Sequence, residues 1–491
     1  MSLPRKYKDV VQIGQGRFGT VYQATSPDKR LVAVKKYTKL SGKDIPYQIL
    51  REINLMRMLN HPNIIKMLDL YMIDTEISIV MEHGGENMDE YGCKLTLKEK
   101  ITQLKRIFYQ IISSCLYMHK LGIMHRDLKL DNILISWDNN KEVPNVKICD
   151  FGLAKRMLPF CRDNNSYQIC TLSYRPPELF VSENEKYTEA VDVWSIGCVM
   201  YEFITGRKLF SGQSEIRVLQ SILQQIPTTE EDLTTLGLDN IRLEKCNTYS
   251  YYKLPMLYDI TTICDEETKE ILDPFKRIVQ TMLVLDPNKR ATLEHIIDDV
   301  FFDNVRGDYR SINSELQKYK ITYYQNFKIR GEIKIPFSLR KVYVHYVQSI
   351  CKDYKISPQT LFISINLFDQ YISGRARASE LEELKSNLVA ISTCCIVLAS
   401  KYIDIKPLKL EDFVSQKFSL KKFVSLERKI LDEIEFELSQ PTLLDLYKDI
   451  VDEVSDKYLM VAKDTIIDYE ELKDKNIPEI KEILRNKIRK L

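Results

Sequence analysis

The 491-residue sequence lacks several features that mark specialised classes of protein. It has no excess of one charge, because 71 Lys and Arg residues oppose 69 Asp and Glu residues, and the formal net charge is +2. So balanced a chain gives no reason to expect a nucleic-acid partner. Its 11 cysteines include no Cys-x-x-Cys pair, so neither a disulfide framework nor a zinc site is indicated. Reduced thiols in the cytoplasm or nucleus fit this pattern best.

Long apolar segments are also missing. The first ten residues, MSLPRKYKDV, lack the apolar core of a secretory signal. The longest apolar run, 388–399, contains Ser and Thr and is too short to span a bilayer, so we expect a buried helix there and no membrane partner. The remaining composition, 44% hydrophobic and 29% charged, is that of a soluble globular protein. A chain of this length is expected to form two or more domains.

The strongest chemical signal is the octapeptide 125–132, HRDLKLDN, which is followed by Asp-Phe-Gly at 150–152. Together they resemble the catalytic loop and the magnesium loop of protein kinases. Phosphoryl transfer requires the protein to position groups and neutralise charge rather than to form covalent bonds. The resemblance implies an Asp that orients the substrate hydroxyl and accepts its proton, a Lys that faces the γ-phosphate, and two ligands for Mg²⁺, namely Asp127, Lys129, Asn132 and Asp150.

Residues 7–37 alternate apolar and polar positions around glycines, which predicts antiparallel strands. They contain a Gly-x-Gly-x-x-Gly motif at 14–19, which alone also fits a dinucleotide-binding turn. Here more strand follows instead of a helix, so the motif is better read as a hairpin whose backbone approaches phosphates. The kinase resemblance then implies an ATP pocket formed by these glycines, apolar walls and a hinge: Ile13, Gly14, Gly16, Gly19, Val21, Ala33, Lys35, Met81, Glu82, Gly84 and Leu134.

Lys35 ends the sequence VAVK, and Glu52 follows 17 residues later in a stretch, 47–60, with the apolar spacing of a helix. A lysine that pairs with both a glutamate and the ATP phosphates makes the position of that helix part of an activity switch. Taken alone, Lys35 would be read as a solvated strand lysine. Its context favours a catalytic role for Lys35 and Glu52.

A closer resemblance appears at 45–53, IPYQILREI, which is similar to the signature helix of cyclin-dependent kinases. The likeness extends over 7–305 and implies an α+β, bilobal kinase fold with a small β-rich lobe and a large helical lobe. Lys129 in the catalytic loop favours Ser/Thr substrates in proteins. A preference for Pro after the phosphoacceptor is implied by the family likeness only.

Asp150 to Glu178 resembles an activation segment, and Ser166 takes the place of the residue that the family phosphorylates. The resemblance assigns Arg51, Arg126 and Lys155 to hold that phosphate through charge-assisted hydrogen bonds. Lys155 replaces an arginine and cannot form its bidentate fork, so the clamp is expected to be weaker. An unmodified surface serine remains the alternative.

The C-terminal part begins with a polar linker, 306–335, and ends with a helical tail, 446–491. Between them, 336–445 resembles a cyclin box, an all-α fold, in three ordered helical stretches at 340–373, 388–405 and 423–441. The resemblance places Lys401 and Glu427 at the positions that bind the backbone beside the kinase signature helix. A cyclin that pressed this helix inward would bring Glu52 to Lys35.

Two functions follow from this organisation. The first is an ATP- and Mg²⁺-dependent Ser/Thr protein kinase that carries its own cyclin as an activator, although the sequence leaves open whether the cyclin acts in cis or in trans. The second is a docking protein whose cyclin half engages host kinases or cyclins, with its own kinase half dispensable. The complete Lys35, Glu52, Asp127, Asn132 and Asp150 set argues against an idle kinase half.

Overall fold

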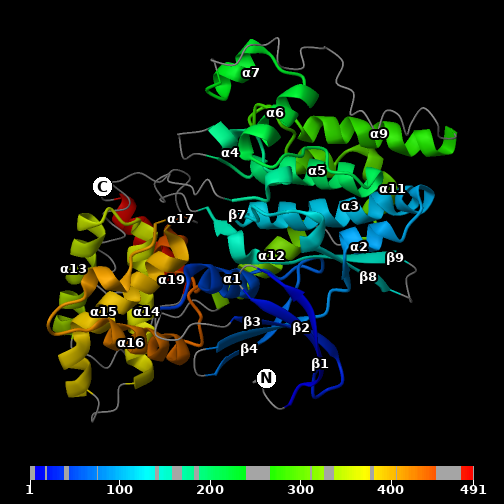
Figure 1. The fold of residues 1–491 in the computed structure, drawn as a ribbon. Coiled ribbons are helices and arrows are strands. Elements are labelled where there is room, and N and C mark those ends of the chain that lie inside the picture. Colours follow the sequence, from blue (N-terminus) through cyan, green and yellow to red (C-terminus); the bar gives the residue numbers. More distant parts are fainter. Residues whose placement is uncertain are drawn as a thin grey trace.

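The computed structural model describes residues 6–16, 19–37, 44–73, 76–138, 143–157, 169–181, 187–238, 266–309, 312–325, 337–375, 381–404, 406–448 and 477–489. The N-terminal half forms a small lobe built on a sheet and a large helical lobe. The helical C-terminal half lies beside helix α1 of the small lobe (Figure 1).

A five-stranded antiparallel sheet in the order β1-β2-β3-β5-β4 forms the small lobe, as the alternating sequence predicts. In β3, side chains alternate between the two faces of the sheet, so Lys35 and Tyr37 point to the same face. Helix α1 covers that face. The strands are β1 (Lys8–Gln15), β2 (Thr20–Thr25), β3 (Leu31–Tyr37), β4 (Met67–Ile73) and β5 (Glu76–Glu82).

Helix α1 spans Tyr47–Met58, so the helix predicted over 47–60 is present and ends two residues earlier. Nine of its twelve residues are buried, including the charged Arg51 and Glu52. A helix on the surface of a domain buries only one stripe of side chains. This helix is covered on more than one side, by the small lobe and by the C-terminal half (Figure 1).

The large lobe is organised around α3 (Leu97–Lys120) and α5 (Ala190–Thr205). Helix α3 starts with a capping box in which Thr96 and Glu99 satisfy each other's backbone N–H groups. Helix α5 is buried along nearly its whole length and carries Asp192 in its first turn. The other helices are α2 (Met88–Cys93), α4 (Glu178–Val181), α6 (Glu215–Gln225), α7 (Glu230–Thr235), α9 (Glu266–Met282), α10 (Leu293–Ile297) and α11 (Asp303–Arg306).

Short strands and 3₁₀ turns connect the two lobes and shape the loops between them. A three-stranded sheet has the order β6-β8-β9, and β7 pairs with β10. The strands are β6 (Glu86–Asn87), β7 (Ile123–Met124), β8 (Ile133–Asp138), β9 (Val143–Ile148) and β10 (Lys155–Arg156). The 3₁₀ turns in this region are η1 (Leu130–Asn132), η2 (Phe151–Leu153) and η3 (Leu172–Tyr174), whereas η5 (Val300–Phe302) lies at the end of the large lobe and η6 (Leu410–Phe413) in the C-terminal half.

The described residues of the C-terminal half form helices and no strands, and these helices are built around α15 (Leu381–Ile403). This helix is long and apolar enough over Ser386–Ile403 to cross a membrane, but 78% of that window is buried inside the protein. It is therefore a core helix, as predicted for 388–399. The other helices are α12 (Ile312–Gln325), α13 (Phe337–Asp353), α14 (Pro358–Arg375), α16 (Leu420–Glu433), α17 (Leu443–Lys448) and α19 (Ile477–Arg489).

The stretch 306–335, which the sequence suggests as a linker, contains the 14-residue helix α12. Helices α11 and α12 both pack against α3, and only residues 307–311 separate them. Leu316 and Tyr319 of α12 pack against the main apolar core, which explains why this polar stretch is helical. At the other end, α17 crosses the expected boundary between box and tail at 445/446.

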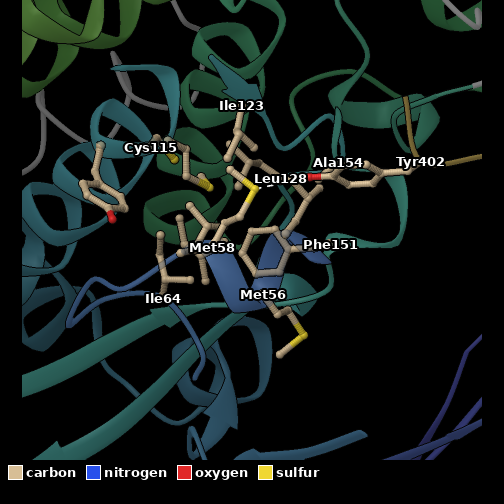
Figure 2. Close-up of a cluster of buried hydrophobic side chains, with 14 of the residues drawn as sticks. Met56, Met58, Ile64, Cys115, Ile123, Leu128, Phe151, Ala154 and Tyr402 are labelled. Carbon is tan, nitrogen blue, oxygen red and sulfur yellow. Dashed lines mark hydrogen bonds between the residues drawn. The ribbon is translucent and has the colours of Figure 1, made fainter. Parts of the chain in front are cut away.

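One apolar core extends through both halves of the chain, from Tyr37 in β3 to Leu484 in α19. Figure 2 shows the part of it around Phe151, where Met56 and Met58 of α1 meet Leu128, Ala154 and, from the C-terminal half, Tyr402. The Tyr402 hydroxyl donates to the Met58 sulfur at 3.3 Å. The two halves therefore share a continuous hydrophobic interior rather than touching only at their surfaces.

Candidate active site

Lys35 lies between two carboxylates supplied by different elements. Its Nζ is 2.7 Å from Glu52 Oε1, on α1, and 2.9 Å from Asp150 Oδ1, before η2. Burial alone would lower the pKa of Lys35, but attraction to Glu52, Tyr37 and Asp150 outweighs it and raises this pKa well above 10.5. The same attraction overcomes burial at Asp150 and lowers the pKa of its carboxyl. Lys35 is therefore cationic and Asp150 anionic at neutral pH.

Glu52 has a second hydrogen-bond partner, Tyr37, whose hydroxyl donates to Oε2. The Tyr37 side chain and the Glu52 side chain are almost completely buried. This contact has no counterpart among the residues suggested by the sequence motifs. The only signal for it is the spacing of Lys35 and Tyr37, two residues apart on one strand.

The loop 125–132 is held in shape by Asp192 of α5. This fully buried carboxylate accepts hydrogen bonds from the backbone N–H groups of His125 and Arg126, both at 2.8 Å, and from His119 Nε2 at 2.9 Å. Arg126 has a φ of 66°, in the left-handed region that costs a non-glycine residue energy. The hydrogen bonds that Asp192 accepts stabilise that backbone conformation and so fix the position of Asp127.

Asp127 points to the beginning of η3 and to its own loop. Its Oδ1 accepts hydrogen bonds from Thr171 N at 3.0 Å and Thr171 Oγ1 at 2.8 Å. Its Oδ2 accepts one from Asn132 Nδ2 at 3.2 Å and lies 3.5 Å from Lys129 Nζ. Asn132 is further held because the same nitrogen donates to Asp127 O at 2.8 Å. The structure thus brings together Asp127, Lys129 and Asn132.

The glycine-rich turn closes through a hydrogen bond from Gly16 N to Gly19 O at 2.9 Å. A Cβ on Gly19 would lie 2.4 Å from Lys36 O, so only glycine allows the turn to lie this close to β3. At the other wall, a Cβ on Gly84 would lie 2.6 Å from Leu134 Cδ1. A larger residue would therefore meet the backbone of β3 at position 19 and the Leu134 side chain at position 84.

The remaining residues predicted to form the ATP pocket include several on the strands of the small lobe. Ala33 lies opposite Met81 in the β3–β5 register, and Gly14 lies opposite Val21 in the β1–β2 register. Ile13 is 50% exposed, an unusual fraction for an isoleucine in a strand and consistent with a wall that is open to a ligand. The side chain of Glu82 is turned to Lys147, at 2.8 Å.

Comparison with known families identifies the family to which this chain belongs. The sequence matches the family model of the protein kinase domain over residues 7–302, which is more than half of the chain. The chain belongs to the protein kinase family. A second model, cyclin, N-terminal domain, matches residues 311–439, and this match includes α12. The kinase therefore carries a cyclin domain in the same polypeptide.

The kinase is similar in sequence to two cell division control proteins. It is 36% identical over 225 residues to cell division control protein 2 homolog 3 of Trypanosoma brucei brucei, covering 45% of this chain and 70% of that protein. To homolog 2 of the same organism it is 29% identical over 315 residues, covering 62% and 85% respectively. The predicted Ser/Thr kinase of the cyclin-dependent type is thus confirmed.

A solved structure supports the fold. The crystal structure of the yeast RNA Pol II CTD kinase CTDK-1 complex matches with a TM-score of 0.51 and 24% identity, covering 62% of this chain and 94% of that one. At this identity the likeness shows the fold alone. The expected fold class, a bilobal kinase followed by an all-α cyclin fold, is confirmed.

A protein kinase domain implies ATP and a divalent metal, and the residues of this site fit both. Among the described residues, no group of three or more His, Cys, Asp or Glu side chains could hold a metal ion by itself. Mg²⁺ is commonly bound by one or two protein oxygens together with substrate phosphates, and Asn132 and Asp150 are a set of this kind. Lys35, cationic and next to Asp150, fits the phosphates themselves.

The kinase–cyclin interface is centred on Lys401 and Glu427, the two residues predicted to make it. Lys401 Nζ lies 3.0 Å from Ile45 O, 2.5 Å from Glu427 Oε1 and 2.7 Å from Asp44 Oδ2. Glu427 Oε2 accepts a hydrogen bond from Ile45 N at 3.0 Å. The backbone just before α1 is therefore bound through both its donor and its acceptor, by two side chains that are nearly or fully buried.

Three polar or charged residues of α1 itself also bind the cyclin, and the sequence predicts none of these contacts. Arg51 Nε donates to the carbonyl oxygens of Lys401 and Tyr402 at 3.0 and 3.1 Å, and its Nη2 donates to Asp404 O. Asn54 Oδ1 accepts a hydrogen bond from Leu438 N at 2.7 Å, and Arg57 donates to Glu435 O. A sequence shows the side chains but not which backbone groups will face them.

Ser166, the predicted phosphorylation site, lies outside the described residues, so the predicted phosphate clamp stays a prediction. Of the three predicted cations, Arg51 binds the cyclin carbonyls. Arg126 donates to Leu153 O at 2.8 Å and to the Tyr187 hydroxyl at 2.7 Å. Lys155 is buried in β10.

Proposed function

We propose that this Ser/Thr kinase is activated by its own cyclin domain, which holds α1 in the position where Glu52 meets Lys35. The observation that carries the proposal is the pair of contacts on α1: Lys401 and Glu427 bind the backbone at Ile45, and Glu52, seven residues further on, bonds to Lys35 at 2.7 Å. Because the cyclin domain binds next to the start of α1 and Lys35 binds Glu52 near the middle of α1, docking of the cyclin domain directly affects the position of Glu52.

In the proposed reaction, Asp127 orients the hydroxyl of a Ser or Thr in a protein substrate and accepts its proton. Lys129, 3.5 Å from Asp127, faces the transferred phosphate, and Lys35 binds the nonreacting phosphates. Mg²⁺ held by Asn132 and Asp150 would neutralise charge that develops on the phosphate oxygens. Thr171 holds Asp127 through two hydrogen bonds, which keeps the base oriented before substrate arrives.

The path of the chain supports activation in cis. Helices α11 and α12 pack on the same helix, α3, with only 307–311 between them, so the first cyclin helix lies against the kinase from which it emerges. Linking two binding partners converts docking into an intramolecular step with an effective concentration of about a millimolar. Such a linkage favours the docked state without a free cyclin.

A preference for Pro after the phosphoacceptor is supported by the backbone next to Asp127. Cys170 has a φ of 62°, and its carbonyl oxygen accepts a hydrogen bond from Arg175 Nη2 at 3.1 Å. Arg175 is itself fixed by Glu215 at 2.6 Å. An acceptor that is already bound to Arg175 is a poor partner for a substrate N–H, and proline is the residue that brings no N–H.

Phosphorylation of Ser166 remains part of the proposal, with Arg126 and Lys155 as its partners. Arg51 contributes less to the phosphate than the family pattern suggests, because its guanidinium already donates to cyclin carbonyls. These bonds are charge-assisted and therefore strong. The cyclin carbonyls thus accept hydrogen bonds from Arg51 that a phosphate would otherwise accept.

The alternative, a docking protein for host kinases, needs the kinase-binding face of the cyclin to be accessible. Lys401 and Glu427 of that face are bound to Ile45 of this chain. This occupancy favours self-activation, and Asp127→Asn separates the two functions because docking should survive the substitution whereas phosphotransfer should not.

The test compares the full chain with a chain that ends at residue 306, using phosphorylation of a protein substrate. We expect the shortened chain to lose nearly all activity and the specific activity of the full chain to stay constant over a hundredfold dilution. Undiminished activity of the shortened chain would show that the cyclin is not an activator. A specific activity that falls on dilution would instead show pairing in trans.

A further inference from the structure

Tyr37 is not part of any motif in the catalytic site, yet its hydroxyl donates a hydrogen bond to the Glu52 carboxylate. Lys35 and Tyr37 lie two residues apart on β3 and share the face that meets α1. Lys35 Nζ binds one oxygen of Glu52, Oε1, at 2.7 Å, and the Tyr37 hydroxyl donates to the other, Oε2. Each oxygen of the carboxylate therefore has its own donor from the same strand.

The burial of this group makes the second donor important. Tyr37 is 1% exposed and Glu52 is 2% exposed, so water cannot readily take the place of the hydroxyl. A buried carboxylate oxygen without a donor is unfavourable, and a carboxylate with one donor can rotate away from it. Because burial and the neighbouring Glu52 raise the pKa of Tyr37 well above 10, the hydroxyl stays protonated and remains a donor at all working pH values.

The Tyr37 ring also lies beneath the glycine-rich turn. A Cβ on Gly19 would be 3.4 Å from Tyr37 Cδ1 and 2.4 Å from Lys36 O, so the turn packs directly on this part of β3. The Lys35 ammonium lies 5.5 Å from the centre of the same ring. One side chain thus contacts the turn, the lysine and the glutamate.

We propose that Tyr37 is a positioning residue for phosphotransfer, whose hydroxyl holds Glu52 in the orientation that keeps its other oxygen on Lys35. The inference rests on the proposed roles of Lys35 and Glu52. It adds a third member to that pair. Tyr37 itself touches no substrate and acts through Glu52.

The test uses Tyr37→Phe in the full chain, which keeps the ring and removes only the hydroxyl. The matched control is Tyr71→Phe, which removes a hydroxyl that donates to another carboxylate of the small lobe, Asp69. We expect Tyr37→Phe to lower kcat/KM for ATP about tenfold, the effect of losing one hydrogen bond to a charged group, with the melting temperature no lower than that of the control.

Combination with Glu52→Ala identifies the partner through which Tyr37 acts. In that background Tyr37→Phe should change kcat/KM by less than about twofold, because there is no carboxylate left to position. An equal loss in both backgrounds, full activity of Tyr37→Phe, or a loss that follows a lowered melting temperature would each overturn the proposal. If instead Glu52→Ala alone is fully active, the proposed function itself fails, which is a different result.

Discussion

Replacing Lys401 by methionine tests the kinase–cyclin interface at its buried ion pair, Lys401–Glu427. Methionine is similar in length to lysine but removes the ammonium, whose three acceptors are Ile45 O, Glu427 Oε1 and Asp44 Oδ2. Glu427 is fully buried, so the substitution leaves its carboxylate without its cationic partner. The perturbation is therefore larger than the loss of one ordinary hydrogen bond.

The expected magnitude follows from this geometry. Removing one partner of a buried ion pair typically costs about 3–5 kcal/mol. At about 1.4 kcal/mol for each factor of ten, docking should weaken by roughly a hundredfold or more. The tether supplies an effective concentration of about a millimolar, so an interface with an intrinsic Kd of about 0.1 mM would be roughly 90% docked in the parent and roughly 10% docked after a hundredfold weakening. For an interface of that strength we expect specific activity to fall about tenfold.

The assay is steady-state phosphorylation of a protein substrate by the full chain. Lys406→Met is the control, because Lys406 is exposed on the same domain. Combining Lys401→Met with Glu427→Met should recover part of the activity, since no fully buried charge is then left without a partner, and the remaining carboxylate, Asp44, is 29% exposed to water. Wild-type activity of Lys401→Met would refute the reasoning, because α1 would then hold its position without the ion pair.

Three other outcomes are expected. Asp127→Asn should lower kcat by about 10²–10³ while the melting temperature stays unchanged, measured by initial rates and thermal unfolding; retained activity would exclude Asp127 as the base. Peptides with Ser-Pro should be phosphorylated at least about tenfold faster than matched Ser-Ala peptides, because the carbonyl of Cys170 is already bound to Arg175, and equal rates would contradict this account. Burial would raise the pKa of Asp192, but its hydrogen bonds with His119 and with the backbone N–H of Arg126 outweigh burial and lower this pKa below 3.8, so the stabilisation from Asp192 is complete above about pH 5 and is lost as the pH falls through the lowered pKa. The free energy of unfolding, measured by urea denaturation, should accordingly differ between the parent and Asp192→Asn by a constant amount from pH 7 to pH 5. This difference should become smaller below pH 4.

The sequence predicts those parts of the site whose chemistry requires a particular residue at a particular spacing. Lys35, Glu52, Asp127 and Asn132 were identifiable because phosphoryl transfer needs these groups, and the structure brings Lys35 to Glu52 and Asn132 to Asp127. Whether each acts as proposed is left to the substitutions above.

Other features depend on which backbone groups meet in the folded chain, and the sequence gives no spacing rule for them. The sequence predicts a phosphate partner in Arg51, and it gives no sign that this guanidinium also donates to the carbonyl of Lys401, 350 residues away in the chain. Tyr37 was missed because a tyrosine in a buried strand is an ordinary core residue until its hydroxyl is seen on Glu52. The polar stretch containing α12 was read as a linker because its few apolar residues give a weak helical pattern.

The short connection between α11 and α12 has a consequence for how cells can regulate this enzyme. A separate cyclin can be synthesised late, degraded early or exchanged for another, and each of these changes the ratio of activator to kinase. In this protein the two are translated together in equal amounts and are removed together. Any control of activity by abundance must therefore act on the whole polypeptide.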